Sequence, residues 1–421
     1  MVRLSDDCFA HDAGHGIQAQ SLDAALADLL PRLSPVTAIE SLPLAACLGR
    51  ALAEPLAAKL DVPPADNAAV DGYAVRHADL TADSQNRLTL LGRAAAGRPY
   101  TGPVPPGHAV RIFTGAPMPA GLDTVLMQED CTAEGNSVLL PPGIARGANR
   151  RLAGEDIAAG QRVLEAGRRL GPAELAMAAA CGHAGLRVRK PLRVALLSTG
   201  DEVNEAGASL PPGGIYDANR PMLAGLLSRL GCTVSDLGIQ PDRPEALRAT
   251  FADAAASHDA IISSGGVSAG EEDHVKAAIA ALGSLHLWRL AIKPGRPVAL
   301  GRIGQAAYFG LPGNPVAAAQ NRPAWPAGAV RKNRKSAPPL RAFAVQADFR
   351  FEKKPGRREW LRASLFPGKD SAWLARKYPL DGAAAIGSLT NSDGVLELAE
   401  AVTQVQPGDR LPFYPFEALG L

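Results

Sequence analysis

The stretch of sequence that decides the fold is Ile261-Ile262-Ser263-Ser264-Gly265-Gly266-Val267-Ser268-Ala269-Gly270-Glu271-Glu272-Asp273. It begins as an apolar run, breaks into small residues with two adjacent glycines, and ends in three acids. This pattern is typical of a buried strand that gives way to a loop. Glycines in such a loop let backbone N–H groups approach an anion, and acids can hold a cation. We therefore expect an anion- and metal-handling site at Ile261–Asp273 in an α/β domain.

The residues around this stretch alternate between strand and helix patterns. Such alternation predicts a parallel sheet covered by helices on both faces, with ligands bound beyond the carboxyl ends of the strands. We assign residues 189–330 to this domain. The expected strands are Leu192–Leu197, Cys232–Ile239, Ala260–Ser263, Leu285–Leu290 and Ala306–Phe309. The expected helices begin at Pro221, at a capping box formed by Asp242 and Glu245, at Asp273 and at Pro315.

The rest of the chain divides into three further units, which makes the expected fold an α/β multidomain one. Residues 18–62 and 150–188 have the pattern of one segmented helical, linking domain, with a helix capped by Ser21 and another over Leu42–Leu56. Residues 63–149 carry short alternating runs between glycines and prolines, which predicts an inserted β-rich domain. Residues 338–421 have short strands and turn signals, typical of a small closed or half-closed C-terminal β domain.

Composition and charge exclude several classes of protein. The 421 residues carry a net charge of only +2 and 5% aromatic residues, so neither nucleic acid nor a membrane surface is an expected partner. The basic run 331–335 fits a solvated linker better than a nucleic-acid patch. Five scattered cysteines without CxxC spacing argue against a disulfide framework and a zinc site. Without a signal-peptide pattern or a long apolar stretch, we expect a cytoplasmic protein.

Four loops follow predicted strands of the α/β domain and combine glycines with hydroxyls, cations and prolines. One such loop is weak evidence, because a tight turn needs glycine anyway. Four of them in one domain predict a phosphate- or oxyanion-binding face. The loops are Leu197–Glu202, Ser263–Gly270, Ile292–Pro297 and Gly310–Pro315.

Acids near the same rim indicate a divalent cation, because a hard ion such as Mg²⁺ prefers oxygen ligands and usually binds a phosphate as well. Two of these acids also have a simpler explanation, because Asp242 and Asp273 are both suited to helix starts. His274 is more typical of a surface residue than of a ligand. The chain has no Ser/His/Asp order, HExxH or GxxxxGKS pattern, which excludes a triad protease, a zincin and a P-loop NTPase.

These loops and further motifs, taken in order, resemble the MoeA family of molybdopterin molybdenumtransferases, which is related to the gephyrin E domain. The resemblance covers about residues 18–421, and its α/β domain is similar to MogA and MoaB. The matching motifs outside that domain are 66–74 (DNAAVDGYA), 114–119 (TGAPMP) and 153–156 (AGED). Within it they are 198–202 (STGDE), 264–268 (SGGVS), 292–297 (IKPGRP) and 310–315 (GLPGNP).

The resemblance implies an elongated homodimer with four subdomains in each chain. Its active cleft is expected between the α/β subdomain of one chain and the β-rich insertion of the other. The implied reaction takes adenylylated molybdopterin and molybdate as substrates, uses Mg²⁺, and gives molybdenum cofactor and AMP. Contacts with the adenylyltransferase and with cofactor-accepting enzymes are also implied.

The same resemblance implies several functional acids and one lysine at matching positions. The two acids outside the α/β domain are expected to reach across the dimer. Among the acids of the α/β domain, Asp273 is the first choice for a Mg²⁺ ligand and Asp242 the second. The implied catalytic residues are Asp71, Asp156, Glu202, Asp242, Asp273 and Lys293.

Substrate contacts are implied for the loops and for the cations beside them. Arg289 stands where the family often has Lys, next to the cationic side formed by Lys293, while Arg357 and Ser388 are implied to meet molybdate. The implied substrate-binding residues are Thr114, Thr199, Gly200, Ser264, Gly265, Gly266, Ser268, Arg289, Pro294, Gly295, Arg296, Pro312, Gly313, Asn314, Arg357 and Ser388.

The sequence departs from the family pattern in two places. Ala68 and Val70 stand where the family usually has Ser and Met. The prolines at 323 and 326 would break a helix, so residues 320–328 form either an unusual linker or a local sequence anomaly. Two alternative functions compete with the transferase: the related adenylyltransferase, whose loop resembles Thr-Gly-Gly-Thr-Gly, and a non-enzymatic scaffold, which would need an extra domain.

Overall fold

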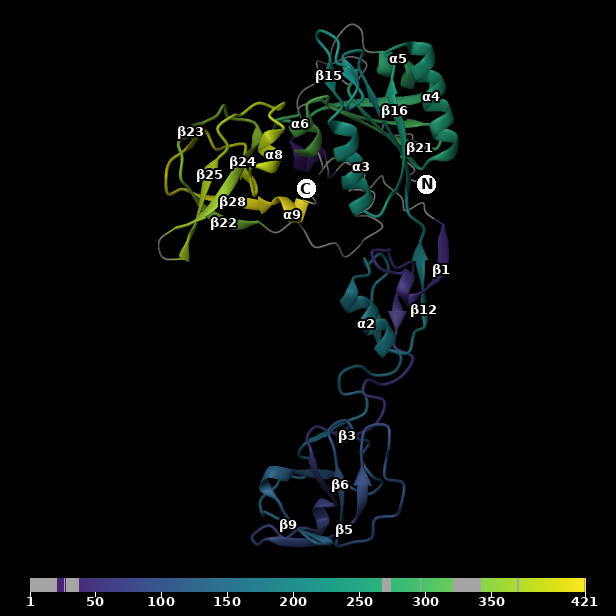
Figure 1. Ribbon diagram of the computed structural model, residues 1–421, viewed down its shortest axis with the longest axis vertical. Coiled ribbons are helices and arrows are strands. Elements are labelled where there is room, and N and C mark those ends of the chain that lie inside the picture. The colour runs from purple at the N-terminus through teal and green to yellow at the C-terminus, as the bar shows by residue number, and fades with distance from the viewer. Residues whose placement is uncertain are drawn as a thin grey trace.

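The computed structural model describes residues 21–25, 27, 38–266, 274–295, 297–320, 342–368, 371–419 and 421. The molecule is elongated (Figure 1). The α/β unit and the C-terminal β unit lie side by side at one end, a small linking unit follows, and the inserted β-rich unit lies at the far end. This confirms an α/β multidomain fold with separate β units.

A six-stranded sheet forms the centre of the α/β unit. The strand order is β16-β13-β17-β21-β20-β18, in which the first four strands are parallel and the last two are antiparallel to their neighbours. The strands are β13 (Arg193–Thr199), β16 (Thr233–Gln240), β17 (Ala260–Ser264), β18 (Gly283–Arg289), β20 (Pro297–Ile303) and β21 (Ala306–Leu311). Four adjacent strands form the expected parallel sheet, and β20 and β18 add an antiparallel edge that makes the whole sheet mixed.

The antiparallel edge follows from a strand that the sequence analysis did not expect. β20 and β21 pair from Ile303 opposite Ala306, so only Gly304 and Gln305 connect them. Two residues can join antiparallel strands but cannot cross over to a parallel one. Gly304 has φ +55°, which suits such a tight turn.

Helices cover both faces of this sheet, as the alternation predicted. α3 packs Leu223, Leu226 and Leu227 on one face, while α4 and α5 pack residues such as Phe251 and Ile279 on the other. The helices are α3 (Asn219–Arg229), α4 (Pro244–Ser257), α5 (His274–Leu282) and α6 (Pro315–Gln320). The expected Asp242 cap is wrong, because Arg243 is the N-cap of α4 and no side-chain cap bond forms there.

The linking unit is built from two separate pieces of the chain. β1 (Ile39–Pro43) pairs with β12 (Gly185–Arg189), and β2 (Leu56–Ala57) pairs with β11 (Arg162–Leu164). α2 (Pro172–Ala180) begins with a capping contact, in which Glu174 Oε2 accepts the Gly171 N–H at 2.9 Å. The helix predicted over Leu42–Leu56 is wrong, because only the short 3₁₀ turn η2 (Leu44–Ala46) is helical there.

The N-terminal helix is described over its first turn. Ser21 Oγ accepts the Ala24 N–H at 3.2 Å, which is the expected capping contact. Leu22 and Ala25 are buried in the core shared with β13 and β17. Residues 28–30 of the predicted helix lie outside the described residues.

The inserted unit contains a six-stranded sheet of order β7-β4-β6-β5-β9-β8. The chain enters and leaves it through one place, where β3 and β10 pair and Val62 bridges to Ile157. Its elements are β3 (Asn67–Ala68), β4 (Gly72–Val75), η3 (His77–Asp79), β5 (Asn86–Ala94), β6 (His108–Ile112), β7 (Thr124–Met127), η4 (Gln128–Asp130), β8 (Thr132–Glu134), β9 (Ser137–Leu140) and β10 (Arg150–Arg151).

The C-terminal unit closes on itself, because β24 pairs with both β25 and β26 while β22 and β28 complete the ring. β19 (Ile292–Lys293) of the preceding segment joins β24 in parallel, which ties this unit to the α/β unit. Its elements are β22 (Phe343–Ala347), β23 (Phe351–Glu352), β24 (Arg358–Pro367), β25 (Trp373–Lys377), α8 (Gly387–Thr390), β26 (Gly394–Leu398), β27 (Gln404–Val405), β28 (Arg410–Pro415) and α9 (Phe416–Leu419).

Candidate functional site

A cavity of about 630 Å³ lies beyond the carboxyl ends of β13, β17 and β21. This is the position at which ligands of open α/β sheets bind. Ala384 and Ile386 of the C-terminal unit also line it. Nine residues predicted from the sequence come together in its wall: Thr199, Gly200, Glu202, Asp242, Ser264, Gly265, Gly266, Gly313 and Asn314.

The two adjacent glycines are required by the close approach of β13. Gly265 has φ +94°, and a Cβ atom there would lie 2.4 Å from the Thr199 carbonyl oxygen. Gly266 has φ +64°, and its Cβ would lie 2.4 Å from Val275 Cγ2. Because no larger residue fits, the loop after β17 keeps its backbone at the floor of the cavity.

Two buried hydroxyls in the cavity wall lack a protein partner. Ser198 and Thr199 are each 2% exposed. Neither hydroxyl oxygen has a hydrogen-bond partner within the described part of the chain. Buried polar atoms are nearly always hydrogen-bonded. These two hydroxyls are therefore available to a polar ligand in the cavity.

The start of α3 contributes cavity residues that the sequence pattern did not predict. Asp217 Oδ1 accepts the backbone N–H groups of Asn219 at 3.1 Å and Arg220 at 3.0 Å. Asp217 and Asn219 both line the cavity. The available signal was Asp217-Ala218-Asn219 before Pro221, since Asp is a preferred residue at helix starts.

Arg220 gathers three carboxylates around this helix start. Its Nε donates to Asp217 Oδ2 at 3.0 Å, one terminal nitrogen donates to Asp236 at 3.0 Å, and the other pairs with Glu205. Burial alone would lower the pKa of Arg220, but the hydrogen bonds with Glu205 and Asp236 outweigh it and raise the pKa. We call Asp217, Arg220, Asp236 and Glu205 the α3 ion network.

One side of the cavity is apolar and open to solvent. β14 (Val203–Asn204) pairs with β15 (Ile215–Tyr216) above the strand ends. Ile215 is 52% exposed and Tyr216 is 46% exposed. The Tyr216 hydroxyl donates to the Ala208 carbonyl oxygen at 3.0 Å, which holds the ring in place. A flat ring of a ligand could lie against these two side chains.

Comparison with known proteins identifies the family. Three family models match, described as "MoeA N-terminal region (domain I and II)" over residues 20–182, "Probable molybdopterin binding domain" over 195–322 and "MoeA C-terminal region (domain IV)" over 344–416. The molybdopterin molybdenumtransferase of Haemophilus influenzae is 35% identical over 404 residues, which cover 95% of this chain and 99% of the relative. The chain belongs to the MoeA family of molybdopterin molybdenumtransferases.

Other relatives of this family agree. The molybdopterin molybdenumtransferase of Nostoc sp. is 39% identical over 297 residues, covering 69% of this chain and 68% of the relative. A crystal structure of the molybdopterin biosynthesis MoeA protein from Pyrococcus horikoshii matches with a TM-score of 0.81 at 26% identity, covering 94% of this chain and 100% of that one. The family places this chain among the transferases of molybdenum cofactor biosynthesis.

Two of the expected cations, Lys293 and Arg357, share one carboxylate of the C-terminal unit. Lys293 Nζ lies 3.2 Å from Glu359 Oε2, and Arg357 lies 3.7 Å from Glu359 Oε1. Glu359 is 1% exposed, so its carboxylate holds both cations from within the C-terminal unit. Neither cation lines the cavity itself.

Ser388 lies below the cavity wall and does not face the cavity. It is completely buried, donates to the Ala385 carbonyl oxygen at 2.6 Å and accepts from Arg362 Nε at 3.0 Å. Pro312 is also buried behind the wall, where its carbonyl oxygen lies 3.4 Å from Asn219 Nδ2. Molybdate contact by Ser388 stays a prediction.

Asp71, Thr114 and Asp156 lie away from the cavity of their own chain. Asp71 Oδ1 accepts from the Thr114 backbone N–H at 2.8 Å and from its hydroxyl at 2.7 Å. The pKa of Asp71 lies below its usual value. The largest cause is the hydrogen bond from the Thr114 backbone N–H, and the second is the bond from the Thr114 hydroxyl. Both residues belong to the inserted unit at the far end of the molecule (Figure 1). Asp156 is exposed in the linking region, with its N–H donating to Val62 O at 3.1 Å.

The remaining predicted residues either lie away from the cavity or are not described by the structure. Pro294 and Gly295 are described in the loop after β19, where Gly295 has φ +95°, but they do not line the cavity. Arg289 lies on β18, and its side chain is not described. The expectations that fall outside are Ser268, Asp273, Arg296, residues 321–328 of the proline-containing stretch and the basic run 331–335.

The described residues contain no group of three or more His, Cys, Asp or Glu side chains that could hold a metal ion. Glu202 and Asp242 are nevertheless both in the cavity wall. The Asp242 N–H also donates to Asp201 Oδ1 at 3.4 Å. Within the described chain, no helix is long and apolar enough to span a membrane.

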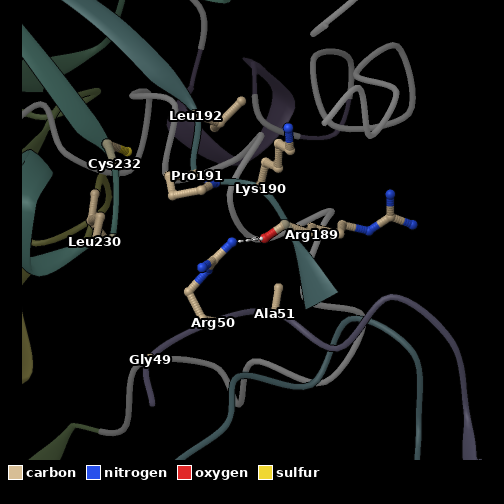
Figure 2. Close-up of a pocket in the computed structure, with 10 residues that line it drawn as sticks. Gly49, Arg50, Ala51, Arg189, Lys190, Pro191, Leu192, Leu230 and Cys232 are labelled. Carbon is tan, nitrogen blue, oxygen red and sulfur yellow. Dashed lines mark hydrogen bonds between the residues drawn. The ribbon is translucent and has the colours of Figure 1, made fainter. Parts of the chain in front are cut away.

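A second, small pocket lies between the linking unit and the α/β unit (Figure 2). Its volume is about 40 Å³. The Arg50 guanidinium donates to the Arg189 carbonyl oxygen at 2.8 Å, while the Arg189 side chain points away from Arg50. Since one water occupies about 30 Å³ in the liquid, this pocket is too small for a pterin or a nucleotide.

Proposed function

We propose that this chain inserts molybdate into adenylylated molybdopterin and releases AMP, giving molybdenum cofactor. The observation that carries this proposal is the cavity of about 630 Å³, whose wall combines two close-packed glycines, two buried hydroxyls without protein partners and two carboxylates. Backbone N–H groups and hydroxyls of this kind suit a phosphate anhydride, and the apolar side of the cavity suits a flat pterin or purine ring.

In the proposed chemistry an oxygen of water or molybdate attacks phosphorus, the anhydride bond breaks and AMP leaves. The two dithiolene sulfurs replace oxygen ligands of molybdate, which leave as water. The protein must hold the pyrophosphate still and stabilise the charge that develops on it. Ser198, Thr199 and Ser264 supply hydroxyls for this, and Lys293, held by Glu359, is the cation proposed for it. The residues therefore bind, orient and neutralise the reacting group.

Mg²⁺ fits this site as an ion carried largely by the substrate. A protein cage is not needed, because Mg²⁺ is usually bound through one or two carboxylates together with substrate phosphates. Glu202 and Asp242 are the carboxylates that would hold it, and the unpartnered hydroxyl oxygens nearby match its preference for oxygen. When bound, Mg²⁺ would offset negative charge on the pyrophosphate. Asp273 stays in the proposal from its sequence position alone.

We also propose a homodimer in which the inserted unit of one chain reaches the cavity of the other. Asp71 and Thr114 support this, because they form a preorganised, exposed pair far from the cavity of their own chain. An exposed carboxylate kept ionised by two hydrogen bonds suits contact with a cation or a donor on a bound substrate.

The proposed reaction is tested by mixing purified protein with adenylylated molybdopterin, Mg²⁺ and molybdate and measuring AMP. We expect AMP release together with cofactor formation. Glu202→Gln should lower AMP release strongly, whereas Glu417→Gln, an exposed glutamate on α9, should not. No AMP from the correctly folded wild-type protein would refute the proposal. ATP consumption with molybdopterin would instead favour the adenylyltransferase.

Mixing two inactive variants tests the shared site. In a dimer of one Asp71→Asn chain and one Glu202→Gln chain, one cavity carries both substitutions and the other carries neither. With random exchange, half of the dimers are mixed, so about a quarter of the wild-type activity should return. If verified subunit exchange restores no activity, Asp71 does not act on the partner's cavity.

A further inference from the structure

Asn219 joins the ends of two strands across the floor of the cavity. Its Nδ2 donates to Ser264 Oγ at 2.6 Å and to the Gly313 carbonyl oxygen at 2.7 Å, with the Pro312 carbonyl oxygen at 3.4 Å. Ser264 ends β17, and Gly313 follows β21. Asn219 is 5% exposed and Ser264 is 4% exposed, so these bonds are shielded from water.

The orientation of the Asn219 amide is fixed by these partners. Two carbonyl oxygens face the side-chain nitrogen, and the opposite orientation would place Oδ1 against both of them. Oδ1 therefore points the other way, and it has no hydrogen-bond partner among the described residues. The backbone of Asn219 is held as well, because its N–H donates to Asp217 Oδ1 at 3.1 Å.

This orientation determines which way Ser264 can donate. An amide nitrogen only donates, so Ser264 Oγ must be the acceptor in the bond with Asn219. The hydroxyl proton of Ser264 is then left for a different acceptor. No protein acceptor for it is found in the described chain, and Ser264 lines the cavity. A bound oxyanion would provide that acceptor.

We propose that Asn219 is a positioning residue of the cavity: anchored by the carbonyl oxygens of the loop after β21, its amide directs the Ser264 hydroxyl proton toward a bound oxyanion. The inference rests on the proposed function, in which the oxyanion is the pyrophosphate of adenylylated molybdopterin. A side chain that both donates to two loops and orders a hydroxyl cannot be replaced by an isosteric acceptor. Aspartate has that shape and has no donor.

The test compares steady-state AMP release by wild type, Asn219→Asp, Asn219→Ala, Ser264→Ala and the double variant Asn219→Ala/Ser264→Ala. Loss of one directed hydrogen bond should raise the KM for adenylylated molybdopterin about tenfold in each single variant. Because Asn219 acts through Ser264, the double variant should be no worse than Ser264→Ala. A hundredfold rise in the double variant, the product of two independent effects, would overturn the inference.

Asn86→Asp is the matched control. Asn86 is 8% exposed, and its Nδ2 also donates to two carbonyl oxygens, those of Thr81 at 3.2 Å and Ser84 at 3.0 Å. It lies at the start of β5, at the opposite end of the sheet from Asp71 and Thr114, so its replacement should lower the thermal stability without changing KM. If Asn219→Asp changes KM no more than Asn86→Asp, the positioning role is refuted.

Two further outcomes separate this inference from the proposed function. If wild-type protein releases no AMP, the proposed function fails and the inference fails with it. If wild type is active and Asn219→Ala has an unchanged KM, only the inference is overturned. If Asn219→Asp does not fold, Asn219→Ala, Ser264→Ala and the double variant still test the inference, because their KM values show whether the two substitutions act together or independently.

Discussion

Substitution of Gly265 by alanine should destabilise the site loop more than an ordinary glycine replacement. The added Cβ would lie 2.4 Å from the Thr199 carbonyl oxygen and 3.1 Å from its hydroxyl oxygen, in a backbone conformation with φ +94°. The left-handed conformation costs about 1–2 kcal/mol for a residue with a side chain. Overpacking against the fixed backbone adds about 1–3 kcal/mol. We therefore expect a loss of about 2–5 kcal/mol.

Gly304→Ala separates these two contributions. Gly304 also has a positive φ, of +55°, but the nearest atom to its Cβ would be Ala255 Cβ at 4.0 Å. It should therefore cost only the backbone contribution of about 1–2 kcal/mol. The assay is hydrogen exchange, which reports the local free energy of opening in a multidomain chain. It is followed at the β13 and β17 amides for Gly265→Ala and at the β20 and β21 amides for Gly304→Ala. Equal losses in the two variants would refute the close-packing argument.

Three further predictions concern single carboxylates. Asp217→Asn removes one buried partner from the α3 ion network and should lower the free energy of unfolding by about 3 kcal/mol, measured by denaturant titration. Thr114→Val removes the bond that contributes second to the lowered pKa of Asp71 and leaves the larger, backbone contribution, so an NMR titration should show that pKa rising while staying below its usual value. Burial raises the pKa of Asp259, but the bonds from Arg193 outweigh it, so the folded pKa is lowered. The Arg193–Asp259 contact therefore stabilises the folded protein above pH 3.8, the ordinary pKa of Asp, and this stabilisation is lost as the pH falls below that value. In Arg193→Met the free energy of unfolding, measured by denaturant titration, should depend less on pH in this range.

The sequence predicted the cavity floor because its features are local. Residues 265 and 266 must be glycine because both have a positive φ and because a Cβ atom at either position would meet Thr199 of β13. Such a requirement is visible in the sequence as the Gly-Gly pair itself. The order of the strands then brings the loops together, since parallel strands place their carboxyl ends at one edge. A motif that combines a buried strand with such a loop therefore predicts both the fold and the site.

Asn219 was missed because its role depends on tertiary contacts. The sequence pattern predicts that the helix begins at Pro221, whereas α3 begins two residues earlier, at Asn219. Nothing in the local sequence shows that the Asn219 amide reaches Ser264 and Gly313, which are 45 and 94 residues away along the chain. Long-range bonds of this kind leave no periodic pattern to detect.

The wrong predictions have a common physical origin. Leu42–Leu56 has helix-compatible spacing, yet Ile39–Pro43 pairs with a strand more than 140 residues later. β20 was overlooked because prolines and a glycine before it indicated a loop, although Pro297 occupies only its first position. In both places pairing with a distant segment outweighed local propensity.

The narrow attachment of the inserted unit has a consequence for how such chains can change. Its two ends meet where β3 pairs with β10, at the spacing of neighbouring strands, about 4.8 Å. If the chain were cut there, a short turn could join the two new ends without changing the path of any other segment. The inserted unit, which carries Asp71 and Thr114, can therefore be lengthened, exchanged or lost as one piece. The six-stranded sheet of the α/β unit would keep all its connections.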